Sequence, residues 1–425
     1  MRKWYKLDNA AKIFPATATS NNSSIYRISF ILNEDINPEL LQQAVDKTIN
    51  RYPTLKVEIK SGLFWNFLIK NENRLIIQEE KKYPCSPITE NNNNNYLIRV
   101  LYYKNKIAIE SFHSLTDGLG TITFLKTLTY QYLLLTGKEI NHENKILLPD
   151  EISPYFEEED SSKKYYHKIK IRKEKHPKAF RIYGTKFDNQ GNNTIHGIVK
   201  VSELKKVAKE RNLSITEFLT TLLIYSIYTE TMRYNNSNNP IVVAVPVNLR
   251  NFFESKTLRN FFCVMNVEVT CKKDMTFEEI SELVKEELKK KLNKEYLEEV
   301  MIKNSNLERN LFIKIIPLFI KNIFLSYGFD VFGEEKKTIT LSNLGNIDLP
   351  VDMKKYIENA EVILYPTIKS PINCALASVG DNMTISFVRT IKENEIIRYF
   401  FRYLSNNCDM NIQVYSNEWG VSSNE

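Results

Sequence analysis

The chain has 425 residues, a formal net charge of +7 and a hydrophobic content of 43%. This length exceeds what one ordinary core holds, and it predicts two domains of roughly 200 residues each. Lysines and glutamates are interspersed, as in residues 284–299, and the five cysteines form no CxxC pair, so neither a nucleic-acid-binding surface nor a zinc site is expected.

Residues 1–14, MRKWYKLDNAAKIF, contain no uninterrupted apolar run and no small-residue cleavage site. A secretory signal needs both features, so we expect the protein to remain in the cytoplasm. In that compartment its scattered cysteines would stay reduced.

The first half is predicted to contain a strand, a helix, a hairpin and a second helix. β-Branched and aromatic residues predict the strand at 24–33, and Asn37-Pro38 supplies an N-cap and a first-turn proline for the helix that follows. Residues 96–112 predict the hairpin, with its turn at Lys104-Asn105-Lys106. Residues 119–136 predict a buried helix that ends at a glycine. His113 to Gly118 therefore connect a strand to a helix.

Residues 149–190 are highly charged and weakly periodic, so we interpret them as the connection between two domains, 1–160 and 161–425. The second half then repeats a similar order of elements. Ser202 is expected to cap one helix, and Ser214 with Glu217 predicts a capping box for the next. Further strands and helices are predicted at 194–202, 240–247, 276–292, 337–345, 360–366, 373–380, 382–390 and 393–406.

The longest apolar run is NLFIKIIPLFIKNIFLSYGF, residues 310–329. Lys314, Pro317 and Lys321 interrupt it and would be costly in the core of a bilayer, so no transmembrane helix is predicted. We interpret the run as a core or domain-crossing helix. The alternative is a peripheral contact with a membrane surface, which would suit a lipophilic substrate.

His113 is the residue on which a functional hypothesis can be built. It directly follows the predicted hairpin and stands four residues before Asp117-Gly118. Without a second histidine or cysteine at ligand spacing, a metal-binding role is disfavoured. Two interpretations stay open on these residues alone: a structural histidine, and a general base that takes the proton of a hydroxyl as it attacks an acyl carbon.

Five motifs occur together along the chain: INRYPTL at 49–55, FHSLTDG at 112–118, SITEFL at 214–219, PVNLRNFF at 246–253 and TLSNLGNIDLP at 340–350. In this order the sequence resembles the acyltransferase superfamily built on the chloramphenicol-acetyltransferase fold. That superfamily includes alcohol acetyltransferases, wax ester synthases and condensation domains, and the start WYKLDNAAKIFP is most similar to the alcohol acetyltransferase branch. The resemblance implies an α/β fold, an α+β sandwich of two similar lobes that form a pseudo-dimer with a tunnel between them.

The resemblance also implies roles for individual residues. His113 matches the second histidine of the family's HHxxxDG signature, which acts as the catalytic base. Asp117 matches its aspartate, which forms a structural ion pair with an arginine of the second half, and Arg250 is the expected partner. Gly118 matches the glycine that lets the backbone turn tightly into the helix, in keeping with glycine's conformational freedom.

Phe112 departs from the signature, because the first histidine is missing there. Its side chain should alternate away from His113, so we expect a packing or orienting role that leaves the base in place. Asn343 and Gly345, on either side of Leu344, match the segment that closes over the family's substrate channel. Ser114, Asn248 and backbone groups near Gly118 are candidate donors to the oxyanion of the reaction.

The resulting hypothesis is an acyltransferase that moves an acyl group, expected to be acetyl, from coenzyme A to an alcohol hydroxyl. Acyl-coenzyme A would be a co-substrate, with no permanently bound cofactor and no metal, and the protein is expected to be a monomer. Two alternatives are a condensation enzyme that forms an ester or amide on a separate carrier protein, and a non-catalytic relative that only binds ligands. Acyl-chain length and acceptor depend on many apolar side chains that the sequence does not place.

Overall fold

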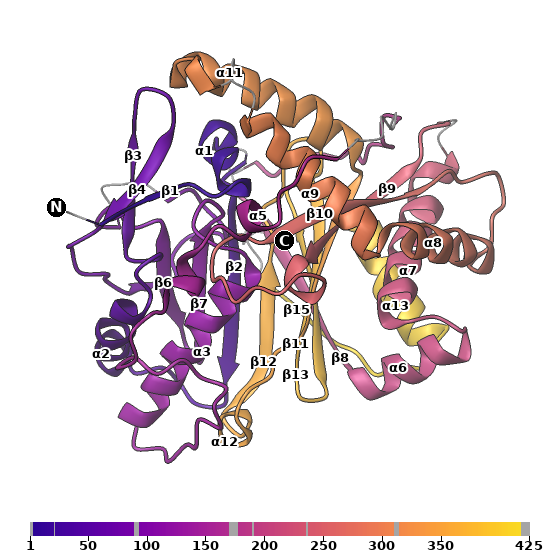
Figure 1. Ribbon diagram of the computed structural model, residues 1–425. Coiled ribbons are helices and arrows are strands. Elements are labelled where there is room, and N and C mark those ends of the chain that lie inside the picture. Colours follow the sequence, from indigo (N-terminus) through magenta and orange to yellow (C-terminus); the bar gives the residue numbers. More distant parts are fainter. Residues whose placement is uncertain are drawn as a thin grey trace.

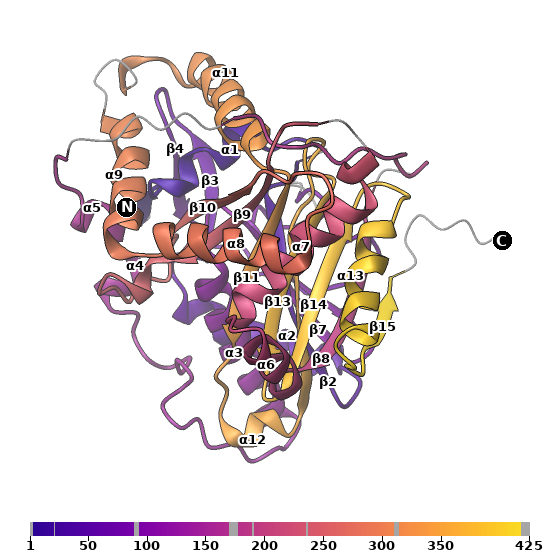
Figure 2. The same ribbon diagram turned by 90° about the vertical axis from the view of Figure 1, so that its right-hand side faces the viewer.

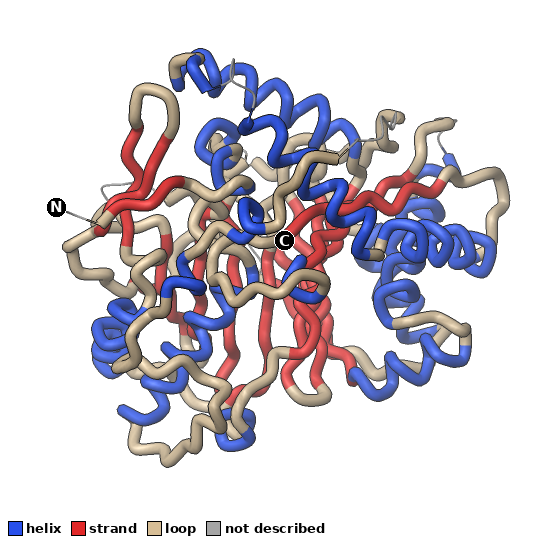
Figure 3. Tube along the Cα trace, in the orientation of Figure 1, coloured by secondary structure: helices blue, strands red, loops and turns tan. Residues whose placement is uncertain are grey.

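The computed structural model describes residues 3–20, 22–88, 93–169, 177–188, 191–234, 237–309 and 314–417. Within these residues the strands form three sheets, of three, five and seven strands. The strands gather in the middle of the molecule, and most helices lie on its outer sides (Figure 3). The protein is therefore the predicted α/β sandwich.

The five-stranded sheet combines strands from both halves of the chain. Its strands, in spatial order, are β12 (Ile357–Ile363), β2 (Ile25–Leu32), β7 (Lys106–Phe112), β6 (Ile98–Tyr103) and β5 (Gln78–Glu79). Helices α2 (Pro38–Thr48) and α3 (Gly118–Leu135) pack together on one side of this sheet. Figure 1 shows β12 beside β2, so the second half adds an edge strand to the first-half sheet.

The predicted signals of the first half are confirmed. The Asn37 side chain accepts hydrogen bonds from the amides of Glu39 and Leu40, as an N-cap should. Lys104 has a positive φ of 49° at the turn between β6 and β7. Gly137, with φ of 84°, follows α3 and allows the left-handed turn that ends the helix.

The seven-stranded sheet belongs to the second half. Its strands, in order, are β10 (Phe262–Val269), β9 (Ile241–Asn248), β11 (Ile339–Asn346), β13 (Ile372–Val379), β14 (Asn382–Arg389), β8 (Asn193–Lys200) and β15 (Gln413–Ser416). Four helices lie in front of it in Figure 2: α6 (Val201–Glu210), α7 (Ile215–Glu230), α8 (Phe277–Lys291) and α13 (Glu395–Asn406). The sequence did not predict β15.

The N-termini of α6 and α7 test the two capping predictions made for the second half. The capping box of Ser214 and Glu217 is formed at the start of α7. The prediction that Ser202 caps a helix is wrong, because α6 begins at Val201 and its N-cap is Lys200. The amide and hydroxyl of Ser202 instead donate to the Asp381 carboxylate, which supplies the acceptor that an N-cap side chain would otherwise provide.

A small sheet and several short helices complete the fold. The sheet orders β1 (Trp4–Lys6), β4 (Asn66–Lys70) and β3 (Val57–Ser61). The short helices are α1 (Phe14–Thr17), α4 (Tyr155–Glu158), α5 (Ser161–Lys164) and α12 (Val351–Lys354), and α9 (Lys294–Arg309) is longer. Part of the charged connection is anchored to the first half, because Arg51 makes two hydrogen bonds to Glu157, of 2.7 and 2.9 Å.

The apolar run at 310–329 forms helix α11 (Leu318–Gly328), and residues 310–313 lie outside the described part. The interpretation as a core helix is wrong, because Phe319 and Ile323 are 71% and 68% exposed. One side of the helix packs on α1 and the tip of the β3–β4 hairpin, which leaves the opposite side uncovered. Within the described residues, none of the helices combines the length and the hydropathy that a bilayer crossing requires.

Candidate active site

His113 lies where β7 ends, surrounded by aromatic rings from both halves. Its amide donates to the Ser24 carbonyl (2.9 Å), and the residue is half-buried. The imidazole stacks almost parallel on Phe14, with ring centroids 4.6 Å apart. The rings of Tyr26 and Phe262 lie 4.7 and 5.2 Å from it. These contacts fix the plane of the imidazole while leaving part of the residue accessible.

The hydrogen bonds of Asn260 favour one tautomer of His113. Its Nδ2 donates to the His113 carbonyl (3.0 Å) and to Oδ2 of Asp8 (3.2 Å). Oδ1 therefore faces Nδ1 of His113, 3.3 Å away, and can only accept. This arrangement favours the tautomer with hydrogen on Nδ1, which leaves a lone pair on Nε2.

The surroundings of His113 also favour its neutral form. Burial lowers the pKa of the imidazole below its usual 6.5, although the Asp117 carboxylate and the hydrogen bond to Asn260 act in the opposite direction. A neutral imidazole with a free Nε2 lone pair can accept a proton near neutral pH. The site can therefore supply a general base.

Asp117 and Arg250 form the ion pair that the sequence predicts. Oδ2 of Asp117 lies 2.7 Å from Nη1 of Arg250, and the two side chains are 8% and 6% exposed. Asp117 also caps α3, since Oδ1 accepts from the Gly120 amide (3.3 Å), and Oδ2 accepts from the Phe261 amide (2.8 Å). One carboxylate thus joins the start of α3 to a loop of the second half.

Arg250 holds that loop, residues 257–261, through its backbone. Its Nε and Nη2 donate to the Thr257 carbonyl at 3.0 and 2.8 Å, and Nη2 also donates to the Arg259 carbonyl at 2.5 Å. The same loop contains Asn260 and directly precedes Phe262. The ion pair therefore positions two of the groups that contact His113.

Gly118 does not play the predicted backbone role, and it instead allows a close approach of Leu344. Its φ is not among the positive values of the described glycines, so it does not use glycine's conformational freedom. A Cβ atom at Gly118 would instead lie 2.8 Å from Cδ2 of Leu344. Leu344 belongs to the segment TLSNLGNIDLP, so two of the motifs pack against each other here.

Gly120 is more constrained than Gly118, and we predict that Gly120→Ala impairs both folding and activity. A Cβ atom there would overlap Oγ1 of Thr116 and the backbone carbonyl of Leu258. Removing this overlap would require the loop at residues 257–261 to move. Overpacking of this kind lowers the free energy of unfolding by about 1–3 kcal/mol. The expected result is a lower midpoint of thermal unfolding together with lower turnover.

The matched control for Gly120→Ala is Gly328→Ala. Gly328 is also helical, but a Cβ atom there meets nothing within 4 Å. Unfolding and activity of this control should stay close to those of the parent protein. Equal behaviour of the two variants would contradict a close contact at Gly120.

The predicted channel residues occupy different surroundings. Ser114 is fully buried and its hydroxyl donates to the Ala11 carbonyl (2.9 Å), so this donor is already used. Oδ1 of Asn248 accepts from the Arg250 amide (3.1 Å), which leaves Nδ2 as its donor group. Nδ2 of Asn343 donates to Thr216 (3.2 Å), and Oδ1 accepts from the Gly345 amide (2.8 Å).

The positive φ of Gly345, 68°, is required by an irregularity in β11. The pairing of β11 with β13 shifts register between Asn343 and Asn346. A residue with a side chain would be strained in this left-handed conformation. Leu344 lies within this irregularity, and its side chain approaches the start of α3 at Gly118.

Phe112 packs as expected on the other side of the strand. It contacts a small apolar cluster of Ile25, Cys85, Ile363 and Val388. Two of these residues come from each half of the chain, so the cluster lies where the halves meet. Phe112, which stands where the HHxxxDG signature has its first histidine, therefore contributes to the apolar core.

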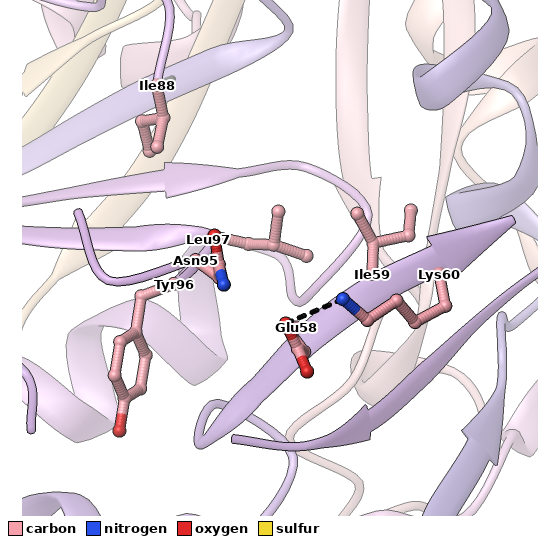
Figure 4. A pocket seen from close by; sticks show the side chains of 7 residues that line it. All are labelled: Glu58, Ile59, Lys60, Ile88, Asn95, Tyr96 and Leu97. Carbon is pink, nitrogen blue, oxygen red and sulfur yellow. Dashed lines mark ion pairs between the residues drawn. The ribbon is translucent and has the colours of Figure 1, made fainter. Parts of the chain in front are cut away.

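Two hollows in the surface lie away from His113. The one in Figure 4 has a volume of ≈ 30 Å³, and an ion pair of Glu58 and Lys60 (3.0 Å) lies beside it. The other, of ≈ 480 Å³, is lined by residues of α7, α8 and α13, among them Tyr225 and Tyr403. His113 lines neither hollow, so the tunnel stays a prediction.

Known proteins match this chain in their structures but not in their sequences. No protein-family model matches the sequence, and no curated protein does. TRI101 of Fusarium sporotrichioides, solved with coenzyme A and T-2, aligns with a TM-score of 0.62 over 94% of this chain and 97% of that chain, at 11% identity. The protein has the fold of the coenzyme A-dependent acyltransferases.

Two further similar structures represent different branches of that fold. The TRI3 trichothecene 15-O-acetyltransferase of the same fungus aligns with a TM-score of 0.59 at 12% identity, over 94% of this chain and 93% of that chain. The starter condensation domain of rhizomide synthetase, solved with C8-CoA, aligns with a TM-score of 0.60 at 12% identity, over 96% and 95%. The acyltransferase fold thus spans nearly the whole chain, and two lobes in one chain are consistent with it.

Proposed function

We propose that the protein transfers an acyl group, acetyl in the first instance, from coenzyme A to the hydroxyl of an alcohol, with His113 as the general base. The observation that carries this proposal is the orientation of the imidazole, whose Nδ1 Asn260 engages; burial, which lowers the pKa of the ring, favours the neutral form that a base needs. The fold adds support, because similar structures are acetyltransferases and condensation domains.

In the proposed reaction, the lone pair on Nε2 of His113 accepts the proton of the alcohol while its oxygen attacks the thioester carbon. The tetrahedral intermediate then collapses as the carbon–sulfur bond breaks, and the imidazolium returns the proton to the thiolate. No covalent acyl-enzyme forms. The negative oxygen of the intermediate needs a donor, for which Nδ2 of Asn248 or a backbone amide near Gly118 is proposed.

The proposed substrates follow from the comparisons and from the surface. TRI101 was solved with coenzyme A, and the rhizomide condensation domain with an acyl-coenzyme A, which supports a coenzyme A thioester as donor. The exposed apolar side chains of α11 favour a lipophilic acceptor. Cytoplasmic location and a monomeric state stay part of the proposal.

Incubation of the purified protein with acetyl-coenzyme A and a panel of alcohols tests the proposal. We expect release of free thiol that depends on the alcohol, and formation of the acetyl ester in equal amount. Release only when the donor is an acyl group on a carrier protein would favour a condensation enzyme instead. Ligand binding without release from either donor would identify a non-catalytic relative.

The pH dependence of the reaction provides a further prediction. Only neutral His113 can act as base, and burial disfavours the imidazolium, so the pKa of the catalytic group is lowered. The rate should therefore fall on acidification with a midpoint below the usual 6.5. A profile of kcat/KM against pH measures this midpoint, and one above 6.5 would contradict the proposed state of the base.

A further inference from the structure

An uncovered apolar face lies on helix α11. It consists of Phe319, Ile323, Phe324 and Tyr327, whose exposed fractions are between 64% and 71%. These residues are spaced by four, five and eight positions from Phe319, so they share one side of the helix. Exposed apolar patches of this kind mark interaction sites in proteins of known function.

The tip of the β3–β4 hairpin extends this face. Leu63 is 72% exposed and Phe64 is 39% exposed. The Leu318 amide donates to the Leu63 carbonyl (2.8 Å), which fixes the hairpin tip beside the start of α11. Figure 1 shows the two elements next to each other along the top edge of the molecule. Below, the α11 surface means these two residues together with the four of the helix.

The one lysine within α11 is turned away from this surface. Lys321 is 2% exposed, and its Nζ donates to the Phe64 carbonyl (2.8 Å). The ammonium lies 3.6 Å from the centre of the Trp65 ring, where a cation–π interaction stabilises the charge. No charged residue is exposed within α11, where Ser326 and the hydroxyl of Tyr327 are the exposed polar groups and Asn322 is half-buried.

Basic residues border the α11 surface. Lys314 is exposed just before the helix, and the Lys60 side chain is 48% exposed on the hairpin, where its ammonium also pairs with Glu58 (3.0 Å). The ammonium of Lys12 lies 5.3 Å from the Trp65 ring beneath the hairpin tip. An apolar face with a basic border is the pattern of helices that lie in the interface of a bilayer.

We propose that the α11 surface docks the protein on an anionic lipid bilayer, with the apolar side chains inserted and the lysines against the headgroups. The lysines and the net charge of +7 complement anionic lipid. A second copy of the chain fits less well, since an isologous contact would bring two identical basic borders together.

The position of α11 connects this surface to the candidate active site. Helix α1 packs against α11. Phe14 of α1 stacks on His113, with ring centroids 4.6 Å apart. If the proposed function holds, bilayer docking places the base beside the compartment in which a lipophilic alcohol is dissolved. The docking itself does not depend on turnover.

Co-sedimentation with vesicles tests the docking. The full chain should bind vesicles of phosphatidylcholine with phosphatidylserine more tightly than vesicles of phosphatidylcholine alone, and added salt should weaken the difference. The double variant Phe319→Ser/Ile323→Ser should bind about tenfold or more weakly, because two inserted side chains are lost. Lys314→Glu should reduce the preference for phosphatidylserine while keeping the apolar contacts.

The control variant is Ile152→Ser/Tyr183→Ser, which removes two side chains, 92% and 83% exposed, outside the α11 surface. It should bind like the parent protein, as should His113→Ala, which separates docking from the proposed function. Absence of binding to phosphatidylserine vesicles, or equal loss in the control variant, would overturn the proposal. So would a dimer in solution that Phe319→Ser/Ile323→Ser dissociates, since the surface would then belong to a second copy.

Discussion

Replacing His113 with alanine is expected to lower turnover by roughly 10²–10⁴-fold while the protein remains folded. The variant loses the lone pair on Nε2, and no other described side chain within hydrogen-bond distance of the ring could replace it, since Asn260 presents a carboxamide. Thiol release from acetyl-coenzyme A in the presence of an accepted alcohol measures the loss. Binding of coenzyme A should be retained.

The control for this variant is a histidine outside the site. His167 has a side chain that is 54% exposed, and its alanine variant should keep full turnover. Thermal unfolding of both variants shows whether a loss of activity has a structural cause, because His113→Ala also removes the stacking on Phe14. Full activity of folded His113→Ala would disprove the base and with it the proposed reaction.

Local signals in the sequence predicted much of the fold. The N-cap at Asn37, the turn at Lys104 and the capping box at Ser214 depend on residues within a few positions of each other. Such contacts can be inferred from spacing. The Ser202 error arose because its acceptor, Asp381, is distant in sequence.

The apolar run at 310–329 shows a second limit of sequence patterns. Its composition indicated burial, but the helix is exposed on the side of Phe319 and Ile323. Lys321, whose charge argued only against a transmembrane helix, is the residue turned inward. The periodicity of apolar residues predicts which of them share one side of a helix. It does not predict whether the protein core covers that side.

Some residues of the candidate site were predictable from motifs, and others are brought there only by tertiary structure. The FHSLTDG motif located His113 and Asp117, and its resemblance to a known signature supplied Arg250 as partner. Phe14 and Asn260 lie about 100 and 150 residues from His113. Phe14 falls within the N-terminal stretch WYKLDNAAKIFP, but nothing in that stretch indicated a contact with His113, and Asn260 belongs to none of the motifs. Only the packing of the two halves brings them to the imidazole.

The second large effect is expected at the buried pair of Asp117 and Arg250. Asp117→Ala leaves the Arg250 guanidinium without its carboxylate and the Phe261 amide without its acceptor. Breaking a buried pair in this way destabilises a protein by about 3–5 kcal/mol. Denaturant unfolding monitored by fluorescence measures the loss, and turnover should fall as well, because the loop that carries Asn260 is released.

A double-mutant cycle separates the pair from its two members. In Asp117→Ala/Arg250→Met neither charge is left unpaired, so the loss of stability should be smaller than the sum of the two single losses. Turnover should nevertheless stay low, because no hydrogen bonds from position 250 reach the Thr257 and Arg259 carbonyls. The exposed pair of Arg74 and Asp46 serves as control, and its removal should change stability little. Additive losses at Asp117 and Arg250 would mean that the two side chains act independently, and that the pair does not hold the loop beside His113.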